Sequence, residues 1–254
     1  MKIVIITQDE PFYLADNLRY LIEILPAHST IVGCVVANAS PFGKKSSFYE
    51  KAKQTLSTFG FNFFFYYSIK FLRNKINPNK QVINVLNDYK IPPITLNAPI
   101  NFDESVKRIK AYSPDLLVSI LGNQIFKKPI LNLAPKGCLN LHTALLPKYR
   151  GLMPTFWVLR HDEKETGVSV FFVDEGIDSG PIVVQEKVDI GGMTQEALIV
   201  HTKKIGMECI AKSIDMIKKG HLKLIENDNS KSTYFSFPTR RDVVEFRKLG
   251  KRFF

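Results

Sequence analysis

The sequence predicts an α/β fold in which a mostly parallel sheet is covered by helices on both faces. Short apolar runs alternate with helical patterns, several runs are apolar on both faces, and 254 residues are enough for one large domain. Strands buried on both faces are typical of parallel sheets whose connections are helices. Ligands bind such sheets at the carboxyl ends of the strands, so we expect the functional residues in the loops there.

The first half of the chain repeats a strand-then-helix pattern. Residues 3–7 form a run rich in isoleucine and valine, and residues 12–25 follow with helical spacing that Pro26 ends. The next expected elements are a strand at 31–37, a basic helix or helical hairpin at 44–74 interrupted near Gly60, a helix at 81–89, an extended segment at 92–96, a helix at 105–112 and a strand at 116–121. This alternation predicts a Rossmann-like sheet.

The second half continues the alternation and then adds a hairpin. The expected elements are a helix at 128–133, a strand at 138–141, a helix at 154–160, a hairpin of 168–173 with 182–188, a helix at 194–219 and a short helix at 241–248. The helix at 194–219 is the clearest, because Thr194 begins it and Lys218-Lys219-Gly220 ends it.

The composition predicts a soluble cytoplasmic protein. Hydrophobic residues make up 45% and charged residues 23% of the chain, and no stretch approaches the roughly 18 apolar residues of a membrane span. The apolar run at the N-terminus is too short for a signal peptide. Three cysteines without C-x-x-C spacing suggest neither a disulfide framework nor a thiolate metal site, and the scattered histidines suggest no zinc site.

The net charge of +11 is concentrated between Lys44 and Lys80, where the sequence has eight basic residues and a single acidic one, Glu50. This charge is compatible with three kinds of partner: a nucleic acid, a membrane surface or a phosphorylated small molecule. The aromatic run at 59–67 lies within it and has three interpretations. It is a core or subunit-contact helix, an interfacial membrane anchor with basic flanks, or a stacking surface for nucleic acid. We favour packing against protein.

One polar cluster has the residue types that acyl transfer needs. Asn140 and His142 share a face of a strand, and both can donate hydrogen bonds to a developing oxyanion. The turn at 174–181 carries three carboxylates, and its glycines allow a tight loop that aims one of them at His142. On spacing alone a second interpretation stays open, in which these are ordinary polar residues at a strand end and the turn only connects a hairpin.

Several blocks in order then resemble the formyltransferase family. They are Asn-x-His-x-x-Leu-Leu-Pro-x-Tyr-Arg-Gly at 140–151, Pro154 with Trp157, Glu-Thr-Gly-Val at 165–168, and the segment 174–182. The family includes glycinamide ribonucleotide formyltransferase, methionyl-tRNA formyltransferase and the sugar N-formyltransferases. The resemblance is strong over about residues 115–187, and the topology extends it loosely to the N-terminus.

The resemblance implies a catalytic set, a formyl donor and no metal. Asn140, His142 and Asp178 match the family's catalytic asparagine, histidine and aspartate. The donor is N10-formyltetrahydrofolate, whose pterin is held largely by main-chain groups of two loops. The implied folate-binding residues are Asn123, Gln124, Ile125, Phe126, Val173, Asp174, Glu175 and Gly176. We expect residues 1–220 to form the formyltransferase catalytic domain and residues 221–254 a C-terminal extension packed on it.

The acceptor is inferred from features outside the catalytic set. Only about thirty residues follow Leu224, too few for the tRNA-binding barrel of methionyl-tRNA formyltransferase. The basic aromatic insertion distinguishes the chain from glycinamide ribonucleotide formyltransferase, whose phosphate-binding glycine and serine pattern is also absent. We therefore expect a nucleotide-linked amino sugar for surface polysaccharide synthesis. Residues implied to contact the acceptor are Asp9, Glu10, Arg150 and Pro154, although a solvated turn explains Asp9 and Glu10 equally well.

Other functions stay open beside this one. They are glycinamide ribonucleotide or methionyl-tRNA formylation, and a non-catalytic protein that binds folate or a nucleotide. No Walker-type loop or glycine fingerprint follows the first strand, which argues against dinucleotide binding. We expect no nucleic acid partner, and the sequence leaves a homodimer open.

Overall fold

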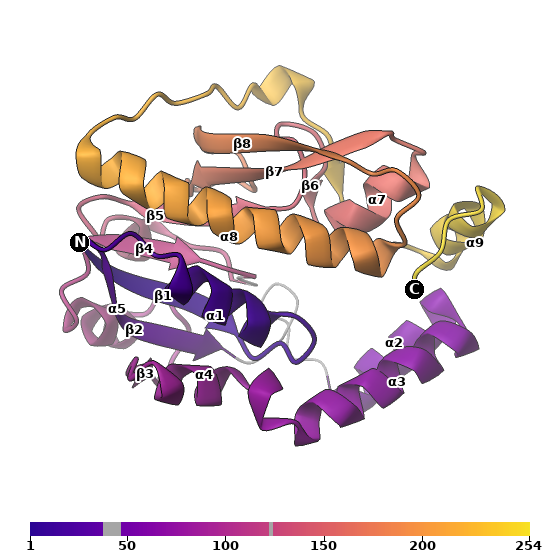
Figure 1. The fold of residues 1–254 in the computed structure, drawn as a ribbon, viewed down its shortest axis with the longest axis horizontal. Helices are drawn as coiled ribbons and strands as arrows, with labels where there is room; N and C mark the ends of the chain where they lie inside the picture. The colour runs from indigo at the N-terminus through magenta and orange to yellow at the C-terminus, as the bar shows by residue number, and fades with distance from the viewer. Residues whose placement is uncertain (38–46, 122–123) are drawn as a thin grey trace.

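The computed structural model describes residues 1–37, 47–121 and 124–254. Within these ranges the main sheet consists of β1 (Lys2–Gln8), β2 (Thr30–Ala37), β3 (Pro93–Ile94), β4 (Leu116–Ser119), β5 (Cys138–His142), β7 (Glu165–Phe172) and β8 (Ile182–Asp189). Their order across the sheet is β3-β2-β1-β4-β5-β7-β8 (Figure 1). The first five are parallel, whereas β7 and β8 are antiparallel to their neighbours. The predicted mostly parallel α/β fold is therefore confirmed.

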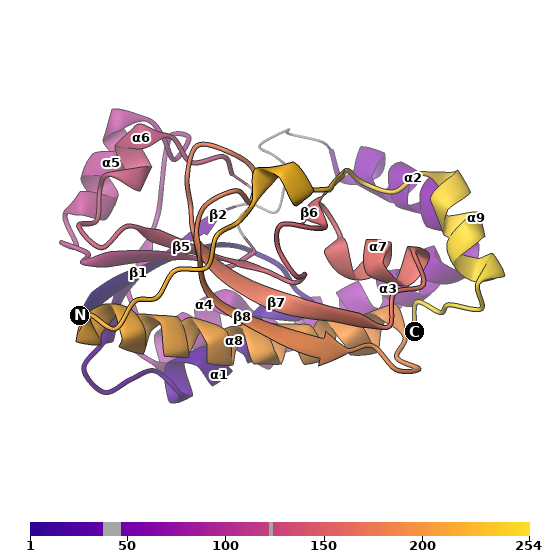
Figure 2. The same cartoon turned by 90° about the horizontal axis from the view of Figure 1, so that it is seen from above.

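Helices cover the sheet on both faces. They are α1 (Leu14–Glu23), α2 (Phe48–Phe59), α3 (Phe61–Ile76), α4 (Val82–Asp88), α5 (Asp103–Lys110), α6 (Lys128–Leu131), α7 (Pro154–Arg160), α8 (Gln195–Lys219) and α9 (Arg240–Lys248), with 3₁₀ turns η2 (Pro78–Lys80) and η3 (Asn229–Lys231). Figure 2 shows α1 and α8 on one side of the sheet and α5 and α6 on the other. Every helix expected from the sequence is present, with bounds shifted by a few residues at most where the chain is described.

The apolar core follows the alternation of side chains along β1. Ile3 and Ile5 belong to the larger buried cluster under α1 and α8, whereas Val4 and Ile6 belong to the smaller one under α5 and α6. Successive side chains of a strand point to opposite faces, so a strand between two helical layers must be apolar at every position. This arrangement explains why the unbroken apolar run predicted a buried parallel strand.

The long helix α8 has the boundaries that the sequence predicted. The Thr194 side chain accepts a hydrogen bond from the Ala197 N–H, and Gly220 ends the helix in the left-handed conformation. Gly206 lets α8 approach β5, because a Cβ atom there would lie 2.6 Å from a methyl carbon of Leu141. That contact shows that Leu141 points from β5 toward α8.

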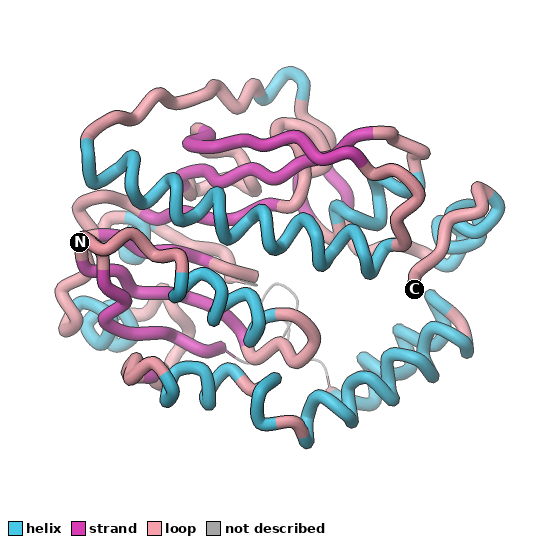
Figure 3. The backbone as a smooth tube through the Cα atoms, in the orientation of Figure 1, coloured by secondary structure: helices cyan, strands magenta, loops and turns pink. Residues whose placement is uncertain are grey.

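The helical hairpin α2–α3 was also expected in outline. Gly60 separates the two helices with a φ of +83°, which favours glycine. Ser47 and Glu50 form a capping box at the start of α2, while residues 44–46 of the predicted segment lie outside the described ranges. Figure 3 shows the hairpin as two adjacent helices at one end of the molecule, near the C-terminal segment. None of the helices in the described ranges has the length and apolarity needed to cross a membrane.

A small second sheet was not predicted. β6 (Arg150–Gly151) pairs in parallel with β9 (Tyr234–Phe235). Gly151 has a φ of +95°, and a Cβ atom there would lie 2.3 Å from the Phe235 carbonyl oxygen, so the pairing requires glycine. The sheet brings the C-terminal segment back over the loop that follows β5.

Candidate active site

The polar face of β5 forms the floor of the candidate site. Leu139 is buried in the larger core cluster and Leu141 points toward α8. Asn140 and His142 therefore lie on the opposite face, since side chains alternate along a strand. β5 runs parallel to β4, so His142 is at a carboxyl end of the parallel sheet, where ligands are expected.

The imidazole of His142 is buried, and each ring nitrogen faces an oxygen of another residue. Its Nε2 lies 2.6 Å from the carbonyl oxygen of Tyr149. Its Nδ1 lies 3.6 Å from Oδ2 of Asp178, and the two side chains are only 7% and 14% exposed. A carbonyl can only accept a hydrogen bond, so Nε2 carries a proton. Nδ1 is consequently the nitrogen that faces Asp178.

The tight turn between β7 and β8 positions Asp178. The Oδ1 atom of Asp174 accepts hydrogen bonds from the Gly176 N–H at 3.0 Å and the Ser179 hydroxyl at 2.6 Å. Gly180 is required, because a Cβ atom there would lie 1.8 Å from the Phe172 carbonyl oxygen. Asp178 itself has a φ of +49°, in the left-handed region that aspartate tolerates better than most residues. The turn thus bends back so that its carboxylate reaches His142.

The Asp178 carboxylate also receives a main-chain hydrogen bond. The Gly151 N–H donates to Oδ2 at 2.9 Å, which fixes the oxygen that faces His142. His142 and Asp178, two of the three residues expected to be catalytic, are therefore in direct proximity, and Asn140 shares the strand face of His142. Their catalytic roles remain predictions.

Tyr149, whose carbonyl oxygen accepts from His142, is itself held firmly. Its ring stacks on Phe235 with centroids 5.4 Å apart, and its hydroxyl donates to Glu163 at 2.6 Å. Burial of the ring, together with the hydrogen bond to Glu163, raises the pKa of the Tyr149 phenol, so it stays a neutral donor. The orientation of the imidazole therefore depends on a residue that the C-terminal segment packs against.

Two further polar side chains support the loop after β5, and sequence reasoning missed them. The Ser169 hydroxyl donates to the Ala144 carbonyl oxygen at 2.7 Å and accepts from the Leu146 N–H at 3.1 Å. Gln185 donates to the Leu146 carbonyl oxygen and to Ser169, both at 2.9 Å. Ser169 pairs with His142 across the sheet. A serine within the apolar run at 168–172 was the available signal, since a buried hydroxyl requires partners.

Arg150, expected to contact the acceptor, is a buried internal residue. Its two terminal nitrogens donate to the side-chain oxygens of Asn229 and Asn227, each at 2.8 Å. Asn227 in turn donates to the carbonyl oxygens of Asp178 and Gly180, both at 2.9 Å. This network ties the end of the loop after β5 to the turn that carries Asp178. Asn227 was also missed, because it lies far away in the sequence.

The two segments expected to bind folate lie side by side. Asn123 falls outside the described residues, Gln124 and Ile125 are partly or largely accessible, and Phe126 is buried. The Val173 N–H donates to the Cys138 carbonyl oxygen at 2.8 Å, which starts the second segment beside β5. Lys128 Nζ lies 3.8 Å from Glu175 Oε2 and links the segments. Contact with folate remains a prediction for both.

The other three residues expected at the acceptor site lie at or near the ends of helices and strands. The Glu10 carboxylate accepts from the backbone N–H groups of Phe12, Tyr13 and Leu14 at 2.9–3.1 Å, at the start of α1. Asp9 is exposed, and Pro154 begins α7. Their contact with an acceptor stays a prediction. Across the described parts of the chain, no group of three or more His, Cys, Asp or Glu residues is arranged to hold a metal ion.

Comparison with known proteins identifies the family of the chain. The family model described as formyl transferase matches residues 72–214, which is more than half of the chain. Methionyl-tRNA formyltransferase of Kosmotoga olearia is 36% identical over 184 residues, covering 70% of this chain and 56% of the relative. The chain belongs to the formyl transferase family. It spans about half the length of the curated methionyl-tRNA formyltransferases that it matches.

Solved structures share the fold at low sequence identity. An N-formyltransferase from Helicobacter canadensis superposes with a TM-score of 0.59 at 19% identity, covering 95% of this chain and 72% of that chain. A phosphoribosylglycinamide formyltransferase from Anaplasma phagocytophilum gives a TM-score of 0.64 at 16% identity, covering 94% and 99%. Both likenesses concern the fold alone.

Proposed function

We propose that the protein transfers a formyl group from N10-formyltetrahydrofolate to a primary amine. The observation that carries this proposal is the buried His142–Asp178 pair beside Asn140, at a carboxyl edge of the parallel sheet. Membership of the formyl transferase family supports the reaction class. The arrangement provides two donors for a developing oxyanion and one carboxylate that accepts protons.

The proposed mechanism assigns each group one task. The acceptor nitrogen attacks the formyl carbon, a new C–N bond forms, and negative charge develops on the formyl oxygen while the bond to the folate N10 breaks. The Asn140 amide and the protonated Nδ1 of His142 donate hydrogen bonds to that oxygen. Asp178 keeps the imidazole charged and accepts a proton from the acceptor nitrogen, by way of water, while N10 takes up a proton as it leaves.

The surroundings of this pair suit a formyl-folate. The segments 124–126 and 173–176 lie beside each other next to β5, and each offers main-chain groups to a pterin. Ile125 and Ile177 are 53% and 43% exposed, so two aliphatic side chains are available to pack on an aromatic ring system.

For the acceptor, we propose the amino group of a nucleotide-linked amino sugar, in the cytoplasm. The Helicobacter canadensis enzyme, whose fold covers almost the whole of this chain, was captured with folinic acid and dTDP-3-aminofucose. The excess of basic residues in the first half of the chain suits a nucleoside diphosphate. Methionyl-tRNA is the second candidate, because methionyl-tRNA formyltransferases are the relatives with 36% identity.

A panel of amines distinguishes these acceptors. The purified protein is mixed with N10-formyltetrahydrofolate and, separately, with dTDP- and GDP-linked amino sugars, glycinamide ribonucleotide and methionyl-tRNA, and the folate absorbance is followed. We expect turnover with an amino sugar nucleotide. Turnover with methionyl-tRNA alone would replace the proposed acceptor. No turnover with any of them would leave a binding protein.

The Asp178→Asn variant tests the mechanism. Asparagine has a similar shape but cannot hold the imidazolium charged or accept the proton, so we expect turnover to fall about a hundredfold or more. The Asp88→Asn variant is the control, because Asp88 is an exposed carboxylate paired with Arg19 on the surface. Both variants are checked for folding by circular dichroism. Near-normal turnover of folded Asp178→Asn protein would contradict the assignment of Asp178.

A further inference from the structure

The outer face of α3 carries a row of exposed large hydrophobic side chains. We call it the outer stripe: Phe61, Phe65, Ile69, Leu72 and Ile76, which are 69%, 55%, 43%, 61% and 81% exposed. An α-helix turns 100° per residue, so these five positions fall within an arc of about 80°. A contiguous apolar row of this kind on a protein surface marks an interaction site more often than a chance exposure.

Polar and basic residues border the outer stripe on both sides. At the same 100° per residue, Asn62 and Arg73 lie along one edge, and Ser68 and Lys75 lie along the other. The helix is therefore amphipathic on its solvent side, with a cation at each border.

The charge around the hairpin has a single sign over a long stretch. From residue 51 to residue 87 the sequence contains six lysines and arginines and no aspartate or glutamate. Two of these six cations, Lys70 and Lys80, pair with Glu196 and Asp16. Arg73 and Lys75, which border the outer stripe, are exposed, so the borders of the stripe are suited to a negatively charged partner.

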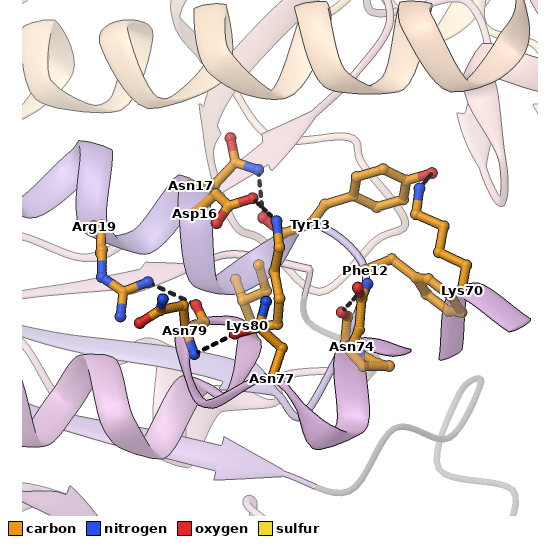
Figure 4. A network of polar contacts seen from close by, with 12 residues as sticks. Phe12, Tyr13, Asp16, Asn17, Arg19, Lys70, Asn74, Asn77, Asn79 and Lys80 are labelled. Atoms are coloured by element: carbon orange, nitrogen blue, oxygen red, sulfur yellow. Dashed lines mark hydrogen bonds and ion pairs between the residues drawn. The ribbon is translucent and has the colours of Figure 1, made fainter. Parts of the chain in front are cut away.

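The inner face of α3 holds the outer stripe toward solvent. Phe63 packs on Phe253 with ring centroids 4.9 Å apart. Lys70 pairs with Glu196 and lies 3.5 Å from the Tyr13 hydroxyl, and Asn74 donates to the Pro11 carbonyl oxygen at 2.9 Å. Figure 4 shows Lys70 and Asn74 reaching from α3 toward the segment before α1. Turning the stripe inward would break all of these contacts.

We propose that the outer stripe docks the protein on an anionic lipid bilayer. The apolar side chains enter the boundary between headgroups and acyl chains, and the bordering cations meet the lipid phosphates. The helix lies in the plane of the surface, in agreement with the finding that no described helix can span a membrane. None of the residues assigned to formyl transfer belongs to the outer stripe or its borders.

Two other occupants fit the surface less well. In a two-fold dimer the same patch faces itself, and a second copy would bring no carboxylate from residues 51–87 to the cations that border the stripe. Single-stranded nucleic acid stacks its bases on aromatic rings, whereas Ile69, Leu72 and Ile76 are aliphatic. A bilayer accommodates aliphatic and aromatic side chains together.

Vesicle sedimentation tests the proposal with the intact chain. Wild-type protein is spun with vesicles of neutral phosphatidylcholine and with vesicles that also contain phosphatidylglycerol. We expect binding to the anionic vesicles that weakens as salt is raised. The double variant Leu72→Ser/Ile76→Ser should lower the partition coefficient at least tenfold. Arg73→Gln/Lys75→Gln should lower it by about ten- to thirtyfold.

Matched variants elsewhere on the surface provide the controls. Ile83→Ser/Val200→Ser removes two exposed aliphatic side chains outside the outer stripe, and Lys136→Gln/Lys223→Gln removes two exposed charges. Neither pair should change binding more than twofold. Equal loss in control and test variants, or no binding of the wild type, would overturn the proposal. The proposal would also be overturned if the wild-type protein did not bind vesicles and instead formed a concentration-dependent dimer that Leu72→Ser/Ile76→Ser abolishes.

A fluorescent label gives a second measurement that does not depend on affinity. The three native cysteines are buried, so an environment-sensitive probe should react only with a cysteine added at the surface. Its emission should shift to the blue on anionic vesicles in Phe65→Cys and stay unchanged in Val200→Cys. An unchanged emission in both variants, with protein bound to the vesicles, would show that another face makes the contact.

Discussion

The loop region around His142 and the helical hairpin α2–α3 are stabilised in opposite ways. Around His142, polar groups from segments far apart in the sequence bind one another, as Gly151 does with Asp178 and Asn227 with Gly180. The hairpin packs on the body through one face and leaves large apolar side chains exposed on the other. Internal hydrogen bonds therefore fix the positions of the residues in the first region, whereas the second region has an apolar surface available to another partner.

The largest effect on stability should come from the inner side of the hairpin. Phe59 is 2% exposed and contacts the rings of Phe63, Phe237 and Phe253 at centroid distances of 4.4–5.7 Å. Phe59→Ala leaves a cavity among these rings, so we expect the free energy of unfolding in urea to fall by about 3–5 kcal/mol. A loss below about 1 kcal/mol would mean that the hairpin is not coupled to the body.

A smaller loss should follow from the network under the candidate site. Asn227→Ala removes the donor to the Asp178 and Gly180 carbonyl oxygens and leaves a nitrogen of buried Arg150 without its side-chain partner. We expect the free energy of unfolding to fall by about 1–3 kcal/mol and turnover to fall with it, because the turn that carries Asp178 loosens.

Asn229→Ala is the matched control for that variant. Asn229 accepts from the other terminal nitrogen of Arg150 but makes no hydrogen bond to the turn at 174–181 among the residues described. It should cost some stability while leaving turnover near the wild-type value. Equal turnover in the two variants would show that Asn227 does not position Asp178.

The smallest effect is expected on the outer side of the hairpin. Phe61 is 69% exposed and lies two residues from buried Phe59, so Phe61→Ala gives a direct comparison of the two faces. We expect its free energy of unfolding to stay within about 0.5 kcal/mol of the wild type in the same urea titration. A loss as large as that of Phe59→Ala would show that Phe61 is packed against protein, for example in a dimer.

Sequence reasoning predicted the sheet and its helices because their signals are local. The apolar run at 3–7 had to be a strand buried on both faces, and Thr194 and Gly220 limited α8 at both ends. The pairing of His142 with Asp178 was also predictable, since glycines around a carboxylate-rich turn allow it to bend back. The strand and the two ends of α8 depended on residues that are neighbours in the sequence.

The features that were missed depend on contacts between distant segments. β6 and β9 have two residues each, too few to show any periodicity, and they pair across more than eighty positions of the chain. The contacts of Arg150, a residue predicted to contact the acceptor, are also of this kind. Its burial against Asn227 and Asn229 could be known only once the C-terminal segment had been placed. The aromatic run at 59–67 divided between the core and the surface, which its composition alone did not indicate.

The position of the hairpin between β2 and β3 has a consequence for how the sheet assembles. The connection from Ala37 to Pro93 must close before these neighbouring strands can pair. The entropy lost in closing a flexible loop grows with its length, by about 0.6 kcal/mol for each doubling. Helices form from local contacts and shorten the distance that such a connection spans. We therefore expect that Pro substitutions within α3, which block its helix, slow the refolding of the edge strand β3.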